Sequence, residues 1–297
     1  MIEFLVVTTP KKLSPGFIAS LEEIIAPATV KKTYRELSRS NVAREYELIA
    51  PTTENRARIQ SICALHEVDM ALIPQRVRAT IQKLVVFDMD STLIQQEVID
   101  EMAKEYGIED QVKAITERAM NGELDFDSAL RERIALLKGF HRSHLEKIRA
   151  RLTLSSGVAL FIRTFRLHGG YTAIASGGFH YFADFFRDSL PMELAVANTL
   201  DWDGDTLSGK VVGDIVNAKK KEEIFIDLTR RLKLEREQTI AVGDGANDLL
   251  MLKQAGMGVA WRAKELVRKE SAYEVNFGPM TTLLYFLGYE GEYFEAV

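Results

Sequence analysis

The chain has 297 residues, of which 46% are hydrophobic, and a formal net charge of −5 at pH 7. This is enough apolar content for about two globular domains, and no basic stretch is long enough to indicate a nucleic-acid partner. With Cys63 as its one cysteine, no signal-peptide pattern and no apolar run near the roughly 20 residues of a membrane span, we expect a cytoplasmic protein without membrane contact.

Residues 1–80 carry the pattern of a small α/β domain. Strand-like "IEFLVVTT" precedes an amphipathic helix in "SPGFIASLEEIIAPA", with Ser14 as the expected N-cap and Pro15 at the first helical position. "TVKKTYREL" and "AREYELIAP" alternate polar and apolar residues, as half-buried strands do. A second helix in "TENRARIQSICALHE" and a strand in "VDMALIP" complete a βαββαβ order, which is ferredoxin-like. The boundary falls in "PQRVRATIQ", residues 74–82, so residues 81–297 form the second domain.

The second domain starts with a different pattern. Near-continuous apolar strands end at Asp88, Ser176 and Asp244, in "KLVVFD", "YTAIAS" and "TIAVGD", and helical stretches lie between them. Such strands predict a parallel sheet that is covered by helices on both faces. Because ligands of these sheets bind at the carboxyl ends of the strands, we expect the three residues to meet at one edge.

A long insertion follows the first of these strands. Residues from about 95 to 160 are helical in pattern, and glycines at 107, 122 and 139 divide them into four segments. A small helical bundle that is inserted next to a strand-end site predicts a cap that acts as a lid.

Asp88 and Asp90 are the first candidates for chemistry. Two carboxylates can hold Mg²⁺ through their oxygens, and one can act as a nucleophile while the other acts as general acid and base. The alternative is a solvated acidic pair in an ordinary turn. For an isolated pair, that alternative is favoured.

Three further stretches supply candidates. "VGDGANDLLML" places Asp244 after a strand and Asn247 and Asp248 at a helix start, "ASGGF" offers Ser176 and backbone N–H groups, and "NAKKKEEI" offers Lys221. Backbone N–H groups at a helix start can cradle phosphate. Taken singly, "ASGGF" is favoured as an ordinary loop and Lys221 as part of a solvated helix face. "VGDGANDLLML" could be a glycine-rich turn with Asp248 as a helix cap.

Together, "DMDST", "SGG", the lysine and "GDGAND" resemble the motifs of the haloacid dehalogenase-like phosphohydrolases. From residue 83 to about 265, the chain is similar to the phosphoserine phosphatase family within that superfamily. This resemblance implies an α/β fold with a Rossmann-like parallel core and a helical cap. It also implies Mg²⁺-dependent hydrolysis of O-phospho-L-serine to L-serine and phosphate, the last step of serine biosynthesis, through an aspartyl-phosphate.

The resemblance assigns roles to the acidic residues. Asp88 would be the nucleophile, and Asp90 would protonate the leaving oxygen and later activate water. Mg²⁺ would be bound by Asp88, by the main-chain carbonyl of Asp90 and by Asp244. Asp248 would support this metal site from behind its ligands.

The resemblance also predicts residues that contact the phosphoryl group, namely Ser176, Gly177, Lys221 and Asn247. Lys219 and Lys220 are neighbours of Lys221. Lys221 is preferred because its distance to "GDGAND" fits the family best.

Substrate selection would belong to the cap. Phosphoserine carries an ammonium and a carboxylate, which call for a buried anion and a bidentate cation. Glu97 and Arg133 match the family's residues for these two groups, and Met120 and Phe126 match its apolar cap contacts. On residue type alone, these four would be exposed helix charges and packed bundle residues.

Two other functions remain open from the sequence. The same intermediate could pass its phosphoryl group to homoserine, or a different small phosphomonoester could be the substrate. In a different class, the chain could be a regulatory module that is switched by phosphorylation of Asp88; such a module would need neither Asp90 as an acid nor a cap.

The remaining segments add two expectations. The N-terminal domain resembles an ACT-like domain in strand order, which is compatible with effector binding, with a homodimer through this domain, or with scaffolding. "DWDGDTL", residues 201–207, is similar to a calcium loop, but its glycine is at the fourth position, so a hairpin turn is expected.

Overall fold

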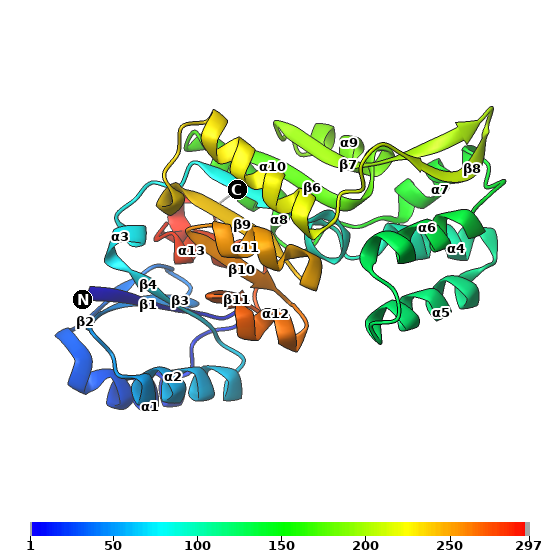
Figure 1. Cartoon of the computed structure of the whole chain (residues 1–297). Coiled ribbons are helices and arrows are strands. Elements are labelled where there is room, and N and C mark those ends of the chain that lie inside the picture. The colour runs from blue at the N-terminus through cyan, green and yellow to red at the C-terminus, as the bar shows by residue number, and fades with distance from the viewer. Residues whose placement is uncertain (1, 295–297) are drawn as a thin grey trace.

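The N-terminal domain is a four-stranded antiparallel sheet with two helices on one face (Figure 1). The structure is a computed structural model that describes residues 2–294, apart from the side chains of residues 30–33 and 120. The elements are β1 (Ile2–Thr8), α1 (Pro15–Ile25), β2 (Thr29–Glu36), β3 (Ala43–Ile49), α2 (Thr53–Leu65) and β4 (Asp69–Pro74). A 3₁₀ turn, η1 (Ala26–Ala28), follows α1. The strand order β2-β3-β1-β4 is ferredoxin-like, which confirms the prediction.

The sequence explains where the first helix begins and which face it buries. The hydroxyl of Ser14 accepts a hydrogen bond from the Phe17 N–H at 3.1 Å, and Pro15 occupies the first turn, as expected. Phe17 and Leu21 lie one turn apart and are buried against Leu5 of β1. The apolar stripe of α1 and the alternation in β1 thus form one small core.

The second domain has a seven-stranded sheet in the order β11-β10-β9-β5-β6-β7-β8, parallel except for β8. A short helix, α3 (Gln75–Arg78), leads to it. Its strands are β5 (Leu84–Phe87), β6 (Tyr171–Phe179), β7 (Leu194–Asp203), β8 (Thr206–Val212), β9 (Thr239–Gly243), β10 (Met257–Trp261) and β11 (Tyr273–Val275). Its helices are α8 (Val158–Leu167), α9 (His180–Ser189), α10 (Ala218–Arg231), α11 (Leu249–Gln254), α12 (Glu265–Glu270) and α13 (Thr282–Phe286). This arrangement confirms the predicted Rossmann-like core.

Both faces of this sheet are covered, as the apolar strands predicted. In β5, Leu84 and Val86 pack in the cluster that contains Phe225 of α10, whereas Val85 and Phe87 pack in the cluster that contains Phe161 of α8. The pleat sends alternate side chains to opposite faces, so a strand that is buried on both sides must be apolar throughout.

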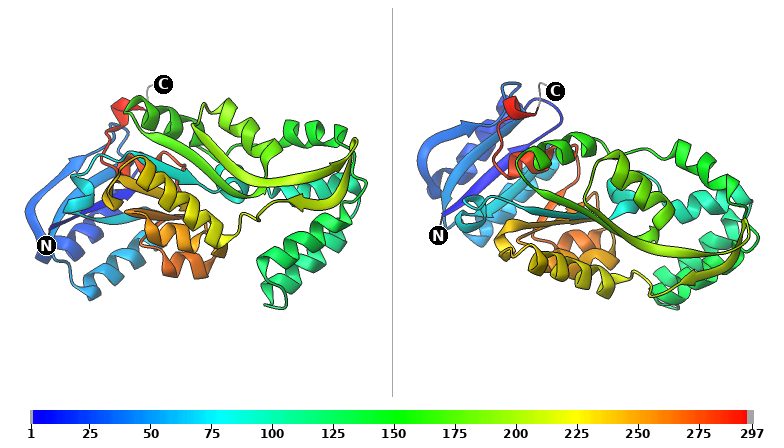
Figure 2. Two further views of the ribbon diagram at one scale, coloured as in Figure 1. Left: turned by 45° about the horizontal axis from the view of Figure 1, so that its top comes forward. Right: turned by 90° about the horizontal axis from the view of Figure 1, so that it is seen from above.

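The cap lies between β5 and β6 in the sequence and at the end of the molecule remote from the N-terminal domain (Figure 2). It consists of α4 (Val98–Tyr106), α5 (Glu109–Met120), α6 (Phe126–Leu136) and α7 (Ser143–Arg151). The expected β7–β8 hairpin is present, and it contacts the cap. Gly139 N–H donates to Leu207 O at 2.8 Å, and Leu207 N–H donates to Phe140 O at 2.9 Å.

The two domains share a hydrophobic cluster. Val6 and Ile73 of the N-terminal sheet belong to the same buried cluster as Leu283 of α13. Beyond α13, the C-terminal segment returns to the N-terminal domain, where Glu290 lies 2.7 Å from Arg35 and the Gly291 N–H donates to Leu37 O at 2.6 Å. The acidic, aromatic segment after α13 therefore fastens one domain to the other.

Two observations refine the expectations. β6 was expected to end at Ser176 but continues to Phe179, with an irregular register after Ala175. Within residues 2–294, no helix is long and apolar enough to cross a membrane.

Candidate active site

Asp88 lies at the carboxyl end of β5 and is 5% exposed. It precedes η2 (Met89–Leu93), a short turn of π type whose first N–H, that of Met89, donates to Asp88 Oδ1 at 2.7 Å. The other carboxylate oxygen lies 2.8 Å from Lys221 Nζ. These contacts fix the carboxylate at the edge of the sheet where the parallel strands end.

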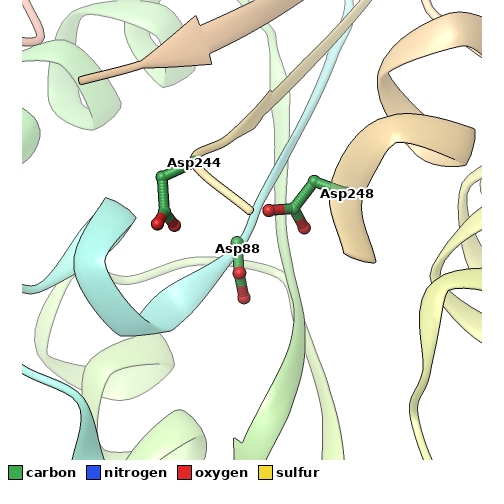
Figure 3. Close-up of side chains that lie close together, drawn as sticks. All are labelled: Asp88, Asp244 and Asp248. Atoms are coloured by element: carbon green, nitrogen blue, oxygen red, sulfur yellow. The ribbon is translucent and has the colours of Figure 1, made fainter. Parts of the chain in front are cut away.

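Three carboxylates converge at this edge (Figure 3). Asp88, Asp244 and Asp248 each offer an oxygen, and these oxygens all lie within 4.8 Å of one another. Asp244 follows β9 and accepts a hydrogen bond from Thr92 Oγ1 at 3.0 Å, while Asp248 Oδ2 accepts from the Gly245 N–H at 3.0 Å. This group includes Asp248, for which the sequence suggested a supporting position. Oxygen donors in such a cluster could hold a divalent metal ion.

The carboxylates of this cluster outnumber the nearby cation, the ammonium of Lys221. Burial, and then the neighbouring carboxylate of Asp248, raise the pKa of Asp244 to about 7. Burial also raises the pKa of Asp88 well above its ordinary value, with Asp248 adding to the effect and Lys221 opposing it. A divalent cation between these oxygens would favour their ionised forms.

Lys221 is the lysine that enters the site. It lies in the first turn of α10, is fully buried, and places Nζ 2.7 Å from Asp248 Oδ1 and 2.8 Å from Asp88 Oδ2. Although burial alone would lower the pKa of Lys221, the carboxylates of Asp248 and Asp88 raise it above its usual range. Lys219 is exposed, and Lys220 points to the surface carboxylates of Asp214 and Glu223 at 3.8 and 3.5 Å.

Asp90 has the environment of a protonated acid. Burial raises its pKa well above the ordinary value, and the negative charges of Glu97 and Asp88 raise it further. Its Oδ1 atom is buried without a hydrogen-bond partner among the described residues. A buried carboxyl group whose pKa is raised can donate its proton to a leaving group.

The segment of residues 176–178, at the irregular end of β6, passes close to Asp90. Ser176 is buried, and its Oγ accepts a hydrogen bond from the Gly178 N–H at 2.9 Å. A Cβ atom on Gly178 would lie 2.7 Å from Asp90 Oδ2 and 2.8 Å from Met89 Cε, so a larger residue here would displace these side chains. The second motif therefore packs closely against Asp90 of the first.

The cap brings its charged residues to the same place. Glu97 precedes α4 and accepts a hydrogen bond from Ser91 Oγ at 2.6 Å; Ser91 itself has a left-handed backbone, with φ of +55°. Arg133 is in α6, and burial lowers its pKa while the carboxylates of Asp100, Glu97 and Asp90 oppose the shift. Glu97 is exposed, in contrast to the buried anion expected for an ammonium, but Glu97 and Arg133 both lie within electrostatic reach of Asp90.

Phe126 of the cap packs over the end of β6. Phe126 begins α6, and a Cβ atom on Gly177 would lie 2.8 Å from its Cζ, so the ring covers this glycine. The side chain of Met120 lies outside the described residues. Asn247 is half-buried in η4 (Ala246–Asp248), with its side-chain oxygen folded over Gly245, and its role stays a prediction.

Three residues of the site were missed by the sequence reasoning. They are Thr92, which holds Asp244, Gly178, which admits Asp90, and Asp100, which adds a negative charge near Arg133. The Ser-Thr pair after Asp90 and the second glycine of "SGG" were visible signals for the first two. Asp100 looked like an ordinary exposed charge of a helix.

Comparisons with known proteins agree with this geometry. A family model of haloacid dehalogenase-like hydrolases matches residues 82–256. The phosphoserine phosphatase of Haemophilus influenzae is 44% identical over 218 residues, which are 73% of this chain and 69% of that protein.

Solved structures extend the likeness to the N-terminal domain. A HAD family hydrolase from Salmonella enterica serovar Typhi superposes with a TM-score of 0.87 at 31% identity, over 96% of this chain and 98% of that one. A probable phosphoserine phosphatase from Vibrio cholerae gives 0.80 at 32% identity, over 99% and 89%. A substrate-bound phosphoserine phosphatase complex gives 0.66 at 35% identity, over 70% and 99%. The chain therefore belongs to the haloacid dehalogenase-like hydrolases and, within them, to the phosphoserine phosphatase family.

Proposed function

We propose that this chain is a Mg²⁺-dependent phosphatase that hydrolyses O-phospho-L-serine to L-serine and phosphate. The observation that carries this substrate is the placement of Glu97 and Arg133, both within electrostatic reach of Asp90. A carboxylate can bind the ammonium of the substrate and a guanidinium can bind its carboxylate, while its phosphoester faces Asp88 and Asp90.

The chemistry follows from the two aspartates of "DMDST". Asp88 Oδ attacks phosphorus, the bond between phosphorus and the serine oxygen breaks, and Asp90 gives its proton to that oxygen. This step yields L-serine and an aspartyl-phosphate. Asp90, now ionised, takes a proton from a water molecule, which attacks the phosphorus and releases phosphate and free Asp88. The raised pKa of Asp90 suits both halves of this cycle.

The phosphoryl group needs donors and positive charge around it. Lys221 supplies a fixed cation beside Asp88, and we assign Ser176, Gly177 and Asn247 to the phosphoryl oxygens. The transferring group carries several negative charges, so catalysis depends mainly on positioning and on charge neutralisation.

The donor set fits Mg²⁺. Four acidic side chains, those of Asp88, Asp90, Asp244 and Asp248, face one lysine in a buried region. We assign the carboxylates of Asp88 and Asp244 and the main-chain carbonyl of Asp90 as ligands, with Asp248 supporting them. When bound, the ion would neutralise the charge that phosphoryl oxygens bring into this acidic pocket.

The relatives support this proposal. The H. influenzae protein is named a phosphoserine phosphatase, and the similar complex holds its substrate. We assign residues 1–80 to an ACT-like domain that is compatible with a homodimer, residues 81–297 to the phosphatase domain, and about 95–160 to its cap.

A substrate series tests the proposal. Phosphate release with Mg²⁺ would be measured for O-phospho-L-serine, for phosphoethanolamine, which lacks the carboxylate, and for 3-phosphooxypropionate, which lacks the amine. We expect kcat/KM for phosphoserine to exceed both by ~10-fold or more, because each missing ion pair removes a charge-assisted contact. Equal values for the three esters would contradict this substrate. Adding homoserine and analysing the products distinguishes hydrolysis from phosphoryl transfer.

A pair of variants on α6 tests whether Arg133 binds the carboxylate of the substrate. Arg133→Ala should lower kcat/KM for phosphoserine by ~10²-fold and change it little for phosphoethanolamine. Arg131→Ala, on the exposed side of the same helix, is the matched control and should leave both unchanged. If Arg133→Ala lowered kcat/KM equally for both substrates, Arg133 would not be the carboxylate ligand.

A further inference from the structure

Residues 176–178, at the irregular end of β6, are called the phosphoryl loop here. This loop is tied to the helix that carries Lys221 through one buried amide. Asn198 of β7 is 2% exposed. Its Nδ2 donates to Gly177 O at 2.8 Å, and its Oδ1 accepts from the Val216 N–H, also at 2.8 Å. One side chain thus fixes the carbonyl of the phosphoryl loop and the segment that leads into α10.

The next residue, Asn217, connects this segment to the cap. Its Oδ1 caps α10 by accepting from the Lys220 N–H at 3.1 Å, and its backbone carbonyl accepts from the Lys221 N–H at 2.9 Å. Its Nδ2 donates to both carboxylate oxygens of Asp127, at 3.0 and 3.3 Å. Asp127 is in the first turn of α6, 90 residues earlier in the chain.

These contacts form a closed circuit. Phe126 is the neighbour of Asp127, and its ring covers Gly177, whose carbonyl is held by Asn198. The circuit of contacts runs from Gly177 to Asn198 and then, through Val216, to Asn217. From Asn217 it continues to Asp127, to the neighbouring Phe126 and back to Gly177. The hydrogen bond between Asn217 and Asp127 therefore links the cap to the segment that precedes α10.

We propose that the pair Asn217–Asp127 is the latch of the closed cap and that Asn217 is a positioning residue for catalysis. It joins cap closure to the placement of the Lys221 helix and, through Asn198, to the phosphoryl loop. A substrate thereby meets the cap contacts and the phosphoryl donors in one aligned state. The activity readout of this inference rests on the proposed function.

The strength of the latch can be estimated from its chemistry. A hydrogen bond to a carboxylate changes an equilibrium by ~10-fold or more, and this pair is half-buried rather than fully exposed. Loss of the latch should therefore shift the balance between closed and open cap by about tenfold. Opening lowers the fraction of enzyme that is ready to bind and react.

A charge exchange between the two residues gives a direct test. Asn217→Asp keeps a side-chain oxygen that can cap α10, since aspartate is as good an N-cap as asparagine, but it sets a second carboxylate against Asp127. We expect kcat/KM for phosphoserine to fall by ~10-fold or more. Combining Asn217→Asp with Asp127→Asn restores a donor and an acceptor in reversed order, and the double variant should return to within about threefold of the parent.

A measurement without substrate separates the latch from the proposed function. Hydrogen exchange of backbone amides in the first turns of α6 and in residues 121–125 should be about tenfold faster in Asn217→Asp and should return to the parent rate in the double variant. Glu132→Ala is the matched control, because Glu132 pairs with Arg118 inside the cap at 2.8 Å. Glu132→Ala should leave the exchange rate and kcat/KM for phosphoserine near those of the parent.

The outcomes decide the inference. Faster exchange and lower kcat/KM in Asn217→Asp, both rescued by the exchange of charges, support the latch. An unchanged exchange rate in Asn217→Asp, or a loss that the double variant fails to rescue, overturns it. If the parent itself does not hydrolyse phosphoserine, the proposed function fails, and the exchange data still decide the latch.

Discussion

Two regions of this protein bury acidic side chains, and they stabilise them differently. Asp69 of β4 is 3% exposed, and its carboxylate accepts hydrogen bonds from the backbone N–H groups of Asn276, Phe277 and Gly278, the shortest at 2.6 Å. The active site instead gathers Asp88 and Asp248 around the single ammonium of Lys221, with further carboxylates nearby.

The difference separates a structural carboxylate from functional ones. The three N–H groups at Asp69 are fixed dipoles that lower its pKa, although burial still raises the pKa overall. In the active site, like charges add to the effect of burial, so these carboxylates are stabilised fully only when a cation is added. Asp69 completes the domain interface, whereas the active-site cluster is arranged for a metal and a phosphoryl group.

The largest expected effect comes from replacing the carboxylate of Asp88 in the active site. Asp88→Asn keeps the size of the side chain and one oxygen, which can accept from the Met89 N–H or from Lys221, but an amide is a poor nucleophile, so kcat should fall by roughly 10⁴-fold or more. Circular dichroism should show an intact fold, and Asp110→Asn on the exposed side of α5 is the control. Near-normal phosphate release by purified Asp88→Asn would falsify the nucleophile assignment.

The next effect concerns the proton of Asp90. Asp90→Asn preserves the size of the side chain and removes its acid, so we expect the chemical step to slow by ~10²-fold or more. A phosphoester with a highly acidic leaving group needs less protonation of that group, so its hydrolysis should slow less in Asp90→Asn. A rate within a few-fold of the parent, measured with phosphoserine under single-turnover conditions, would rule Asp90 out as the acid.

Asp69 gives the structural counterpart. Asp69→Ala leaves three buried N–H groups without their acceptor, so we expect a loss of about 2–4 kcal/mol in the free energy of unfolding. The kcat of the folded protein should stay near that of the parent, because Asp69 does not reach the site. Denaturant unfolding and phosphate release measured together test this contrast, and an unchanged midpoint would show that the interface does not depend on Asp69.

The smallest expected effect is a pH dependence of the melting temperature that is due to Asp244. Asp244 has a folded pKa of about 7 against an ordinary value of 3.8, so the folded, metal-free protein holds a proton that the unfolded chain has lost. The associated stability is fully present below about pH 3.8 and is lost as pH rises through about 7. With EDTA, the melting temperature should therefore fall between pH 5.5 and 7.5. Excess Mg²⁺ should reverse this trend, because it binds the ionised carboxylates; a melting temperature that rises with pH in EDTA would contradict the assigned charge state.

The sequence alone determined the elements and the edge at which the site forms. Ser14 predicted the start of α1, and the apolar run before Asp88 predicted a buried strand. Since parallel strands end at one edge, Asp88 and Asp244 could be placed together from the order of strands alone. These inferences succeed because caps and apolar periodicity act over a few residues of the chain.

Only the tertiary structure decided which distant residues meet. Asp69 accepts from Asn276 across 207 residues, and Asn217 donates to Asp127 across 90. The apolar pattern of an element shows which face is buried but not which partner covers it, and an asparagine before a helix reads equally as a simple cap. The family resemblance already favoured Lys221, and the rotation of α10 against the sheet gives the physical reason that it enters rather than Lys220, because neighbouring helix positions point about 100° apart.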